Sequence, residues 1–153
     1  MRFAVLLLTV SISSLILLRG QSKDDQLAPY YPTPQIVVDR MLQLGGLKAG
    51  EKMFDLGSGD GRIVIMAAQK YESTARVIHG DLLQQDYSSA DLLTVYLLPV
   101  GNELVTPILE KQLKKGARIV AHDFQFAAWA PVQSVSIDDD GEGRSHHLYL
   151  YRR

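Results

Sequence analysis

Hydrophobic and polar residues alternate along the chain with two different periods, which predict helices and strands in turn. Apolar positions that recur at helical spacing predict helices over residues 34–44, 62–71 and 102–113. Short, nearly continuous apolar runs predict buried strands over residues 52–56, 75–79, 91–98 and 118–122. Two strands then follow each other directly, over residues 133–137 and 147–151, around a turn-rich segment. This order predicts an α/β fold with one mostly parallel sheet, helices on both faces and a C-terminal antiparallel hairpin.

The first of these helices carries clear boundary signals. The proline-rich residues 29–34 favour a stiff, extended approach to it. We expect Thr33 to cap the helix, with Pro34 at its first position and the pair Gly45-Gly46 at its end. The apolar face that we expect to be buried consists of Ile36, Val37, Met41, Leu42 and Leu44.

The N-terminal residues form a separate segment. Arg2 and Arg19 flank an uncharged stretch, residues 3–18, which would be about 24 Å long as a helix and is slightly short for a membrane span. This pattern is typical of a signal peptide, although its cleavage site is imperfect, or of an uncleaved anchor. We therefore expect residues 1–22 to be a signal or membrane anchor and residues 23–153 to be the folded domain, exported or held at a membrane. An ordinary N-terminal helix on a cytoplasmic domain is the remaining alternative.

Composition narrows the class of protein. With 153 residues, of which 46% are hydrophobic and 22% charged, the chain suits one globular domain. Its net charge is −1 and no run of Lys or Arg exceeds two residues, so we expect no nucleic-acid partner. The chain has no cysteine, which excludes disulfides and thiolate metal sites.

A glycine-rich turn, with Gly57, Gly59 and Gly61, follows the first strand of the predicted sheet. Ligands of such sheets bind beyond the carboxyl ends of the strands, where this turn lies. Glycine lets the chain reverse and lets backbone approach a ligand closely. The Gly-x-Gly-x-Gly spacing differs from the dinucleotide-binding and phosphate-loop motifs, which disfavours a nicotinamide cofactor. The turn therefore predicts a ligand site of another kind.

Residues 55–65, DLGSGDGRIVI, resemble motif I of the class I methyltransferases that depend on S-adenosylmethionine (SAM). The resemblance is closer to the bacterial relatives of the mitochondrial lysine methyltransferases that modify the ATP synthase c-subunit and the adenine nucleotide translocase. Residues 29–34, 94–99 and 116–124 support it, and it covers about residues 30–151. It implies a Rossmann-like fold, SAM as the cofactor, methyl transfer as the reaction and a protein lysine as the methyl acceptor.

The resemblance also implies how SAM lies. The methionine part would rest over Gly57 and Gly59, with Tyr31 and Thr33 close to its end. Asp55 would hold the loop or, through water, contact the ammonium group of the ligand.

One part of the family pattern is missing. Between the first helix of the motif and the stretch 76–81, the family has a strand with an acidic end and a helix, whereas this chain has only residues 71–75. Roughly two dozen residues are absent, and the lost carboxylate is the one suited to both ribose hydroxyls. The domain is thus expected to be shortened by one strand-helix unit, which exposes a sheet edge. A truncated, non-catalytic remnant or binding module is therefore the alternative function.

Asp81 has two interpretations as a ligand contact. By motif it matches the family residue that contacts the adenine amino group, and by spacing from Gly57 it lies where nucleotide-binding folds keep a ribose carboxylate. We expect residues 75–79 to take the vacant second position of the sheet, so that Asp81 reaches the ribose. The alternative is that Asp81 caps a loop. The predicted cofactor-binding residues are Tyr31, Thr33, Asp55, Gly57, Ser58, Gly59, Gly61 and Asp81.

The catalytic residues and a metal are less well marked. Tyr96, His122 and Asp123 lie near strand ends and are candidates to take a proton from the acceptor. Tyr96 lies inside an apolar strand, which favours a core role, whereas His122 and Asp123 end a strand on the ligand side, where a capping or surface role is the alternative. None is assigned as the base. The pair His146-His147 has no third ligand at a suitable spacing, and residues 138–140 resemble a solvated turn. We therefore expect no metal.

Overall fold

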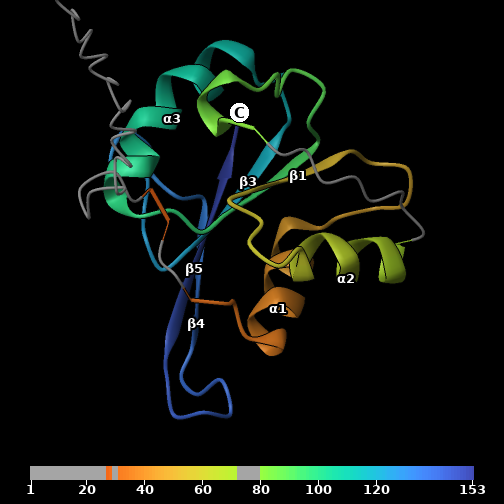
Figure 1. Cartoon of the computed structure of the whole chain (residues 1–153), viewed down its shortest axis with the longest axis vertical. Coiled ribbons are helices and arrows are strands. Elements are labelled where there is room, and N and C mark those ends of the chain that lie inside the picture. The colour runs from red at the N-terminus through yellow and green to blue at the C-terminus, as the bar shows by residue number, and fades with distance from the viewer. Residues whose placement is uncertain (1–26, 29–30, 72–79) are drawn as a thin grey trace, which may run out of the picture.

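The computed structural model describes residues 27–28, 31–71 and 80–153. The predicted signal or anchor and the predicted strand over residues 75–79 lie outside these ranges. The described chain forms one sheet with helices on both faces (Figure 1). Its elements are α1 (Gln35–Gly45), β1 (Met53–Leu56), α2 (Arg62–Tyr71), the 3-10 helix η2 (Leu82–Gln84), β2 (Leu92–Val95), α3 (Pro99–Gln112), β3 (Arg118–His122), β4 (Gln133–Ile137) and β5 (His146–Arg152).

The five strands lie in the order β1-β2-β3-β5-β4. β1, β2 and β3 are parallel, with Met53 opposite Leu92 and Leu92 opposite Arg118. β5 is antiparallel to both β3 and β4. The α/β sheet with its C-terminal hairpin is therefore as the sequence predicts, and β1 is the outermost strand at one end of this order. The carboxyl ends of β1, β2 and β3 all point to the same edge.

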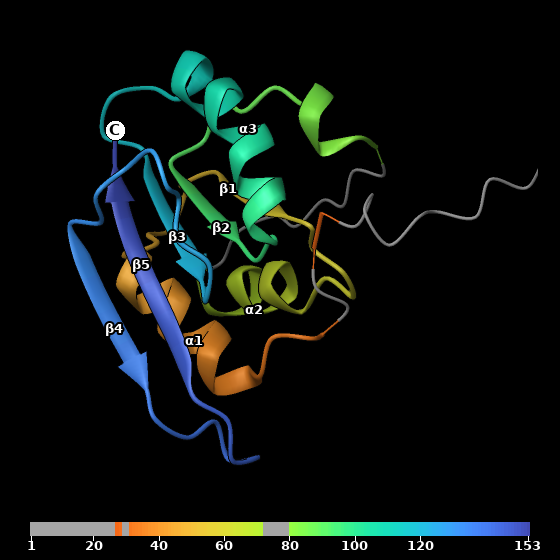
Figure 2. The same cartoon turned by 90° about the vertical axis from the view of Figure 1, so that its left-hand side faces the viewer.

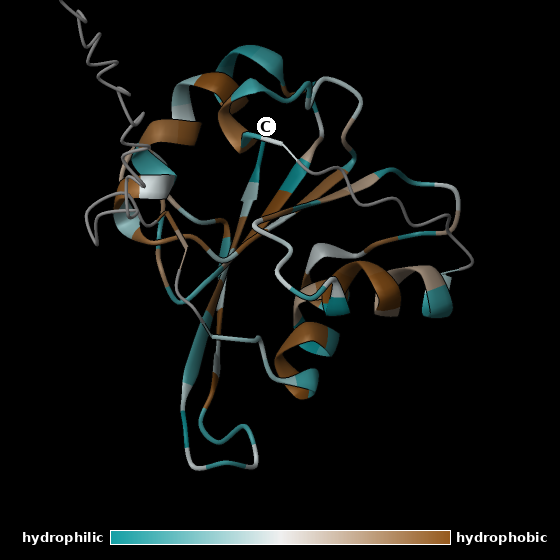
Figure 3. Ribbon diagram, in the orientation of Figure 1, coloured by the Kyte–Doolittle hydropathy of each residue, from teal (hydrophilic) through white to brown (hydrophobic). Residues whose placement is uncertain are grey.

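Helices lie on both faces of the sheet (Figure 2), and a hydrophobic layer packs between the sheet and the helices on each face. Because successive strand residues point to opposite faces, Leu92 packs with the layer under α1 and α2, while Leu93 packs with the layer under α3. Apolar residues gather in these helices and in the strands, whereas the tip of the β4–β5 hairpin is hydrophilic (Figure 3). Within the part of the chain that is described, no helix is long and apolar enough to cross a membrane.

The start of α1 differs from the prediction. Pro34 occupies the N-cap position and no side chain caps the helix, so the expected role of Thr33 as a cap is wrong. Thr33 is instead buried, and its carbonyl accepts a hydrogen bond from Nη1 of Arg62 (2.9 Å). Ile36 is 51% exposed, and Val38 takes its place in the core. Packing against α2 and the sheet therefore decides which residues the N-terminal end of α1 buries.

The segment before α1 crosses the end of β2. β2 stops at Val95, and the amide of Leu98 donates to the carbonyl of Leu27 (2.8 Å), after which α3 begins at Pro99. A β-carbon on Gly101 would lie only 2.6 Å from the Leu27 oxygen, so glycine permits this close approach. The contact places Leu27 beside the carboxyl end of β2.

Candidate active site

Two cavities meet at the glycine turn that follows β1. One, of about 520 Å³, is lined by Tyr31, Thr33, Arg62, Ile63 and Tyr96 among others. The other, of about 640 Å³, is lined by Phe54, Val64, Gly80, Leu82 and Tyr87 among others. Asp55, Gly57, Ser58 and Gly59 line both. An elongated ligand can therefore lie across the turn with one half on each side of it.

The backbone of the turn depends on glycine. Gly57, Gly59 and Gly61 have φ of +79°, +52° and +79°, a region that residues with a side chain seldom adopt. At Gly59 the nearest atom to an added β-carbon would be the Gly57 oxygen at 4.0 Å, so this face of the turn is open to a ligand. The amide of Gly61 closes the turn on the Ser58 carbonyl (2.7 Å), directly before α2.

Asp55 lies beneath the turn and accepts one strong hydrogen bond. Oγ1 of Thr94, on the neighbouring strand β2, donates to Oδ1 of Asp55 (2.7 Å). Burial raises the pKa of the Asp55 carboxyl from its usual range to about 7, against the opposing effect of the Thr94 hydrogen bond, and the charge of Asp60 adds to the rise. Asp55 therefore carries a proton over much of the acidic pH range and ionises near neutrality.

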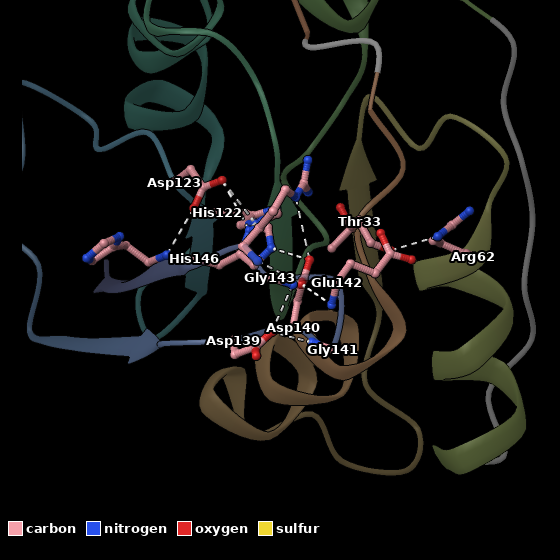
Figure 4. Close-up of polar contacts among 12 residues, drawn as sticks. Thr33, Arg62, His122, Asp123, Asp139, Asp140, Gly141, Glu142, Gly143 and His146 are labelled. Atoms are coloured by element: carbon pink, nitrogen blue, oxygen red, sulfur yellow. Dashed lines mark hydrogen bonds and ion pairs between the residues drawn. The ribbon is translucent and has the colours of Figure 1, made fainter.

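Arg62, the first residue of α2, joins the turn to the segment before α1. Its guanidinium pairs with the Asp60 carboxylate (2.6 Å) as well as donating to the Thr33 carbonyl (Figure 4). The hydrogen bonds from Arg62 lower the pKa of Asp60. On the other side, the Arg144 guanidinium lies 3.6 Å from the centre of the Tyr31 ring, a cation–π contact. Tyr31 and Thr33 are thus held at the first cavity from both sides.

Asp81 lies at the start of η2, where it acts as the N-cap. Its carboxylate accepts from the amide of Leu83 (2.9 Å) and from Nε2 of Gln84 (3.1 Å). Its neighbours Gly80 and Leu82 line the second cavity, whereas Asp81 does not. The structure therefore shows the loop cap that the sequence left open, and a contact of Asp81 with the ribose stays a prediction.

Two of the three candidates for proton transfer, Tyr96 and His122, lie against each other. Tyr96 is half-buried and lines the first cavity, and its pKa is raised by burial and then by the charge of Asp123. His122 is fully buried behind it, with its ring 4.0 Å from the Tyr96 ring. Burial lowers the pKa of His122 to about 4, so it is neutral at physiological pH. Of these two residues, Tyr96 is the one that lines a cavity and can face a ligand.

A polar cluster behind Tyr96 includes residues that the sequence did not single out as partners. Nε2 of His122 lies 2.9 Å from Nδ1 of His146, and Nε2 of His146 lies 3.0 Å from Oδ2 of Asp140. The Asp140 side chain has no solvent exposure, so the prediction of a solvated turn is wrong for this residue. Hydrogen bonds from His146 and from the amides of Glu142 and Arg144 hold the pKa of Asp140 well below its usual range. Sequence spacing carries no signal for this cluster, because the β3–β5 pairing creates it.

Comparison with known proteins identifies the family. Residues 67–133 match the family model of the ANTKMT methyltransferase domain. A protein-lysine N-methyltransferase from Saccharolobus islandicus is 33% identical, over 80% of this chain and 92% of its own. The human lysine N-methyltransferase of the ATP synthase c-subunit is 26% identical, and this chain spans 54% of its length. The structure is also similar to that of an RNA methyltransferase from Salinibacter ruber in complex with S-adenosyl-L-homocysteine, with 35% identity and a TM-score of 0.70 over 80% of this chain and 93% of the other.

The Rossmann-like sheet, the glycine turn and these likenesses define a SAM-dependent methyltransferase. The chain belongs to the family that contains the Saccharolobus enzyme and the relatives of the ANTKMT domain, as the sequence resemblance implies. SAM is its cofactor and methyl transfer is its reaction. The alternative of a non-catalytic remnant finds no support among these relatives.

The comparison also bears on the shortened segment. The alignment with the Saccharolobus enzyme extends over 150 positions but takes in only 80% of the 153 residues here. Some positions of the relative in this alignment therefore have no counterpart in this chain.

The raised pKa of Asp55 gives a test by pH. The native state keeps this proton where the unfolded chain has lost it, so ionisation of Asp55 costs stability as the pH rises from about 4 to about 7. In the ligand-free protein, Asp55→Asn is expected to gain stability relative to wild type over this range, by at most about 1.4 kcal/mol per pH unit. Urea unfolding at pH 5 and pH 8 measures the difference.

Asp86→Asn is a control for which the expected change in stability has the opposite sign. A hydrogen bond from the amide of Ser88 lowers the pKa of Asp86, so the ionised form of Asp86 favours the native state. Removal of this carboxylate should therefore lower the stability of the protein near neutral pH. An Asp55→Asn variant with the same relative stability at both pH values would contradict the role assigned to burial.

Proposed function

We propose that the chain transfers the methyl group of SAM to a lysine side chain of a protein. The observation that supports this proposal is the distribution of charge around the first cavity. Among the described residues, each nearby cation already has a partner. Arg62 pairs with Asp60, and Arg144 lies between Asp140 and the Tyr31 ring. Such a site favours a cationic acceptor over a polyanion, because nucleic-acid binding needs unpaired Lys and Arg.

In this proposal SAM lies across the glycine turn. The methionine part occupies the cavity lined by Tyr31 and Thr33, and the adenosine part occupies the cavity lined by Phe54 and Tyr87. Gly57 and Gly59 allow the ligand to approach the backbone between the two. Ionised Asp55 attracts the ammonium group of the methionine part, directly or through water. Bound SAM supplies an activated methyl group, so the main task of the protein is alignment of donor and acceptor.

The acceptor amine then enters beside Tyr96. The ring forms part of the cavity wall, and the raised pKa keeps the hydroxyl neutral. The lysine ammonium first loses a proton to solvent, after which the neutral Tyr96 hydroxyl accepts a hydrogen bond from the amine and orients its lone pair toward the methyl group. Transfer of the methyl group then leaves S-adenosylhomocysteine and a methylated ammonium. Relatives named as protein-lysine N-methyltransferases support this acceptor class, and the similar structure named as an RNA methyltransferase supplies the competing one.

Transfer of a radioactive methyl group distinguishes the two acceptors. The full chain is incubated with SAM labelled on the methyl group and with cell extract, followed by protease or by ribonuclease. We expect label that protease releases, ribonuclease leaves in place and hydrolysis yields as methyl-lysine. Tyr96→Phe is expected to lower the rate by about tenfold or more while SAM still binds, because general acid–base and orienting groups typically contribute on this scale. Label that ribonuclease releases would contradict the lysine assignment.

We also propose that residues 1–22 export the domain or hold it at a membrane. The uncharged stretch 3–18 supports this, and only residues 19–26 separate it from Leu27, which contacts the start of α3. An uncleaved anchor would therefore keep the active site close to a bilayer, near acceptor lysines at a membrane surface. Fractionation of cells that express the full chain tests the proposal: recovery in washed membranes or outside the cytoplasm is expected, and recovery in the cytosol alone would contradict it.

A further inference from the structure

Three groups that can bind a metal converge where β3 ends and β5 begins. They are His122, Asp123 and His146, which lie together (Figure 4). The His122 ring contacts the Tyr96 ring, with 4.0 Å between the ring centres. Both histidines are buried, with exposures of 0% and 2%, and Asp123 is partly exposed. The β3–β5 pairing brings them together from positions more than 20 residues apart, which is why spacing along the chain does not reveal them.

The separations between the three donor atoms match one face of a tetrahedral site. Nε2 of His122 and Nδ1 of His146 are 2.9 Å apart, and Oδ2 of Asp123 lies 3.3 Å from the first and 3.4 Å from the second. Ligand atoms around a tetrahedral Zn²⁺ ion, with bonds of about 2.0–2.1 Å, are separated by about 3.3 Å. An ion therefore fits against this triangle with little movement of the side chains.

The groups around the triangle orient its donor atoms. Asp140 accepts the Nε2 proton of His146, which leaves the Nδ1 lone pair facing His122 and Asp123. A carboxylate behind a histidine in this way is the usual support of a metal-binding histidine. Asp123 adopts a left-handed φ of +58°, and the His147 amide holds its other oxygen, Oδ1, at 2.9 Å. Oδ2 is thereby turned toward the two histidines.

We propose that Nε2 of His122, Nδ1 of His146 and Oδ2 of Asp123 bind a divalent transition-metal ion, with Zn²⁺ as the expected occupant. Two imidazoles and one carboxylate suit such an ion, whereas Mg²⁺ and Ca²⁺ prefer oxygen ligands alone. Water completes the coordination. The site is distinct from the SAM cavities, because none of its three ligands lines them.

The bound ion has a structural role in the first cavity. It joins the end of β3 to the start of β5 directly behind the Tyr96 ring, which packs on His122. Through Asp140, whose Oδ1 accepts the Arg144 amide (3.1 Å), it also steadies the hairpin that carries Arg144 over Tyr31. The ion therefore supports both aromatic residues of the cavity without contact to the substrate.

Metal binding to the full chain, stripped with a chelator, tests the proposal. Titration with Co²⁺, followed by its visible absorption, and calorimetry with Zn²⁺ are each expected to give one equivalent at a tetrahedral site. His146→Gln removes a ligand and is expected to abolish the Co²⁺ spectrum. Asp140→Asn keeps all three ligands and is expected to weaken Zn²⁺ binding by about 10- to 100-fold.

His147→Gln is the matched control. His147 neighbours a proposed ligand in the chain but is exposed, and its ring stacks on Tyr149 outside the cluster. Its substitution should leave Co²⁺ binding unchanged. Binding of S-adenosylhomocysteine checks that each variant is folded. Wild-type protein that shows no tetrahedral Co²⁺ spectrum, or equal losses in His146→Gln and His147→Gln, would overturn the proposal.

Discussion

The structure depends on the glycine turn after β1, whose backbone conformation residues with a side chain seldom adopt. Three glycines with positive φ carry the chain from β1 into α2, and the open face of this turn separates two cavities that share it. A β-carbon at Gly57 would lie 3.3 Å from Leu97 and 3.7 Å from Ala28, in addition to the strain of its φ. Side chains here would strain the backbone and cover the surface on which a cofactor can lie. The other features of the site hold this turn in place.

Each neighbour of the turn comes from a different part of the chain. Thr94 on β2 holds Asp55 from below, and Arg62 on α2 holds the carbonyl of Thr33 from the side. The contact of Leu27 with Leu98 places Leu27 at the end of β2. A site assembled in this way is rigid where the methionine part of SAM is proposed to bind. The cavity proposed for the adenosine part is lined instead by residues of β1, of η2 and of the loop after η2.

Apolar spacing was sufficient to predict most elements, since it reports directly which face of a helix or strand is buried. α2, β3 and β4 have the predicted bounds. The turn at residues 57–61 is also where it was predicted, and its glycines have the positive φ that glycine readily adopts. Thr33 departs from the prediction because Arg62, distant in sequence, binds its carbonyl. The association of Asp140 with His146 could not be predicted either, because it follows from the closure of the hairpin. Tertiary contacts of this kind leave no local pattern in the sequence.

We expect one SAM molecule to span the glycine turn, with its halves in the two cavities. A crystal structure of the full chain with S-adenosylhomocysteine tests it most directly. The account predicts the amino-acid part of the ligand between Thr33 and Gly59, and the adenine beside Phe54 and Tyr87. A ligand bound away from the turn, or no bound ligand at saturating concentration, would contradict it.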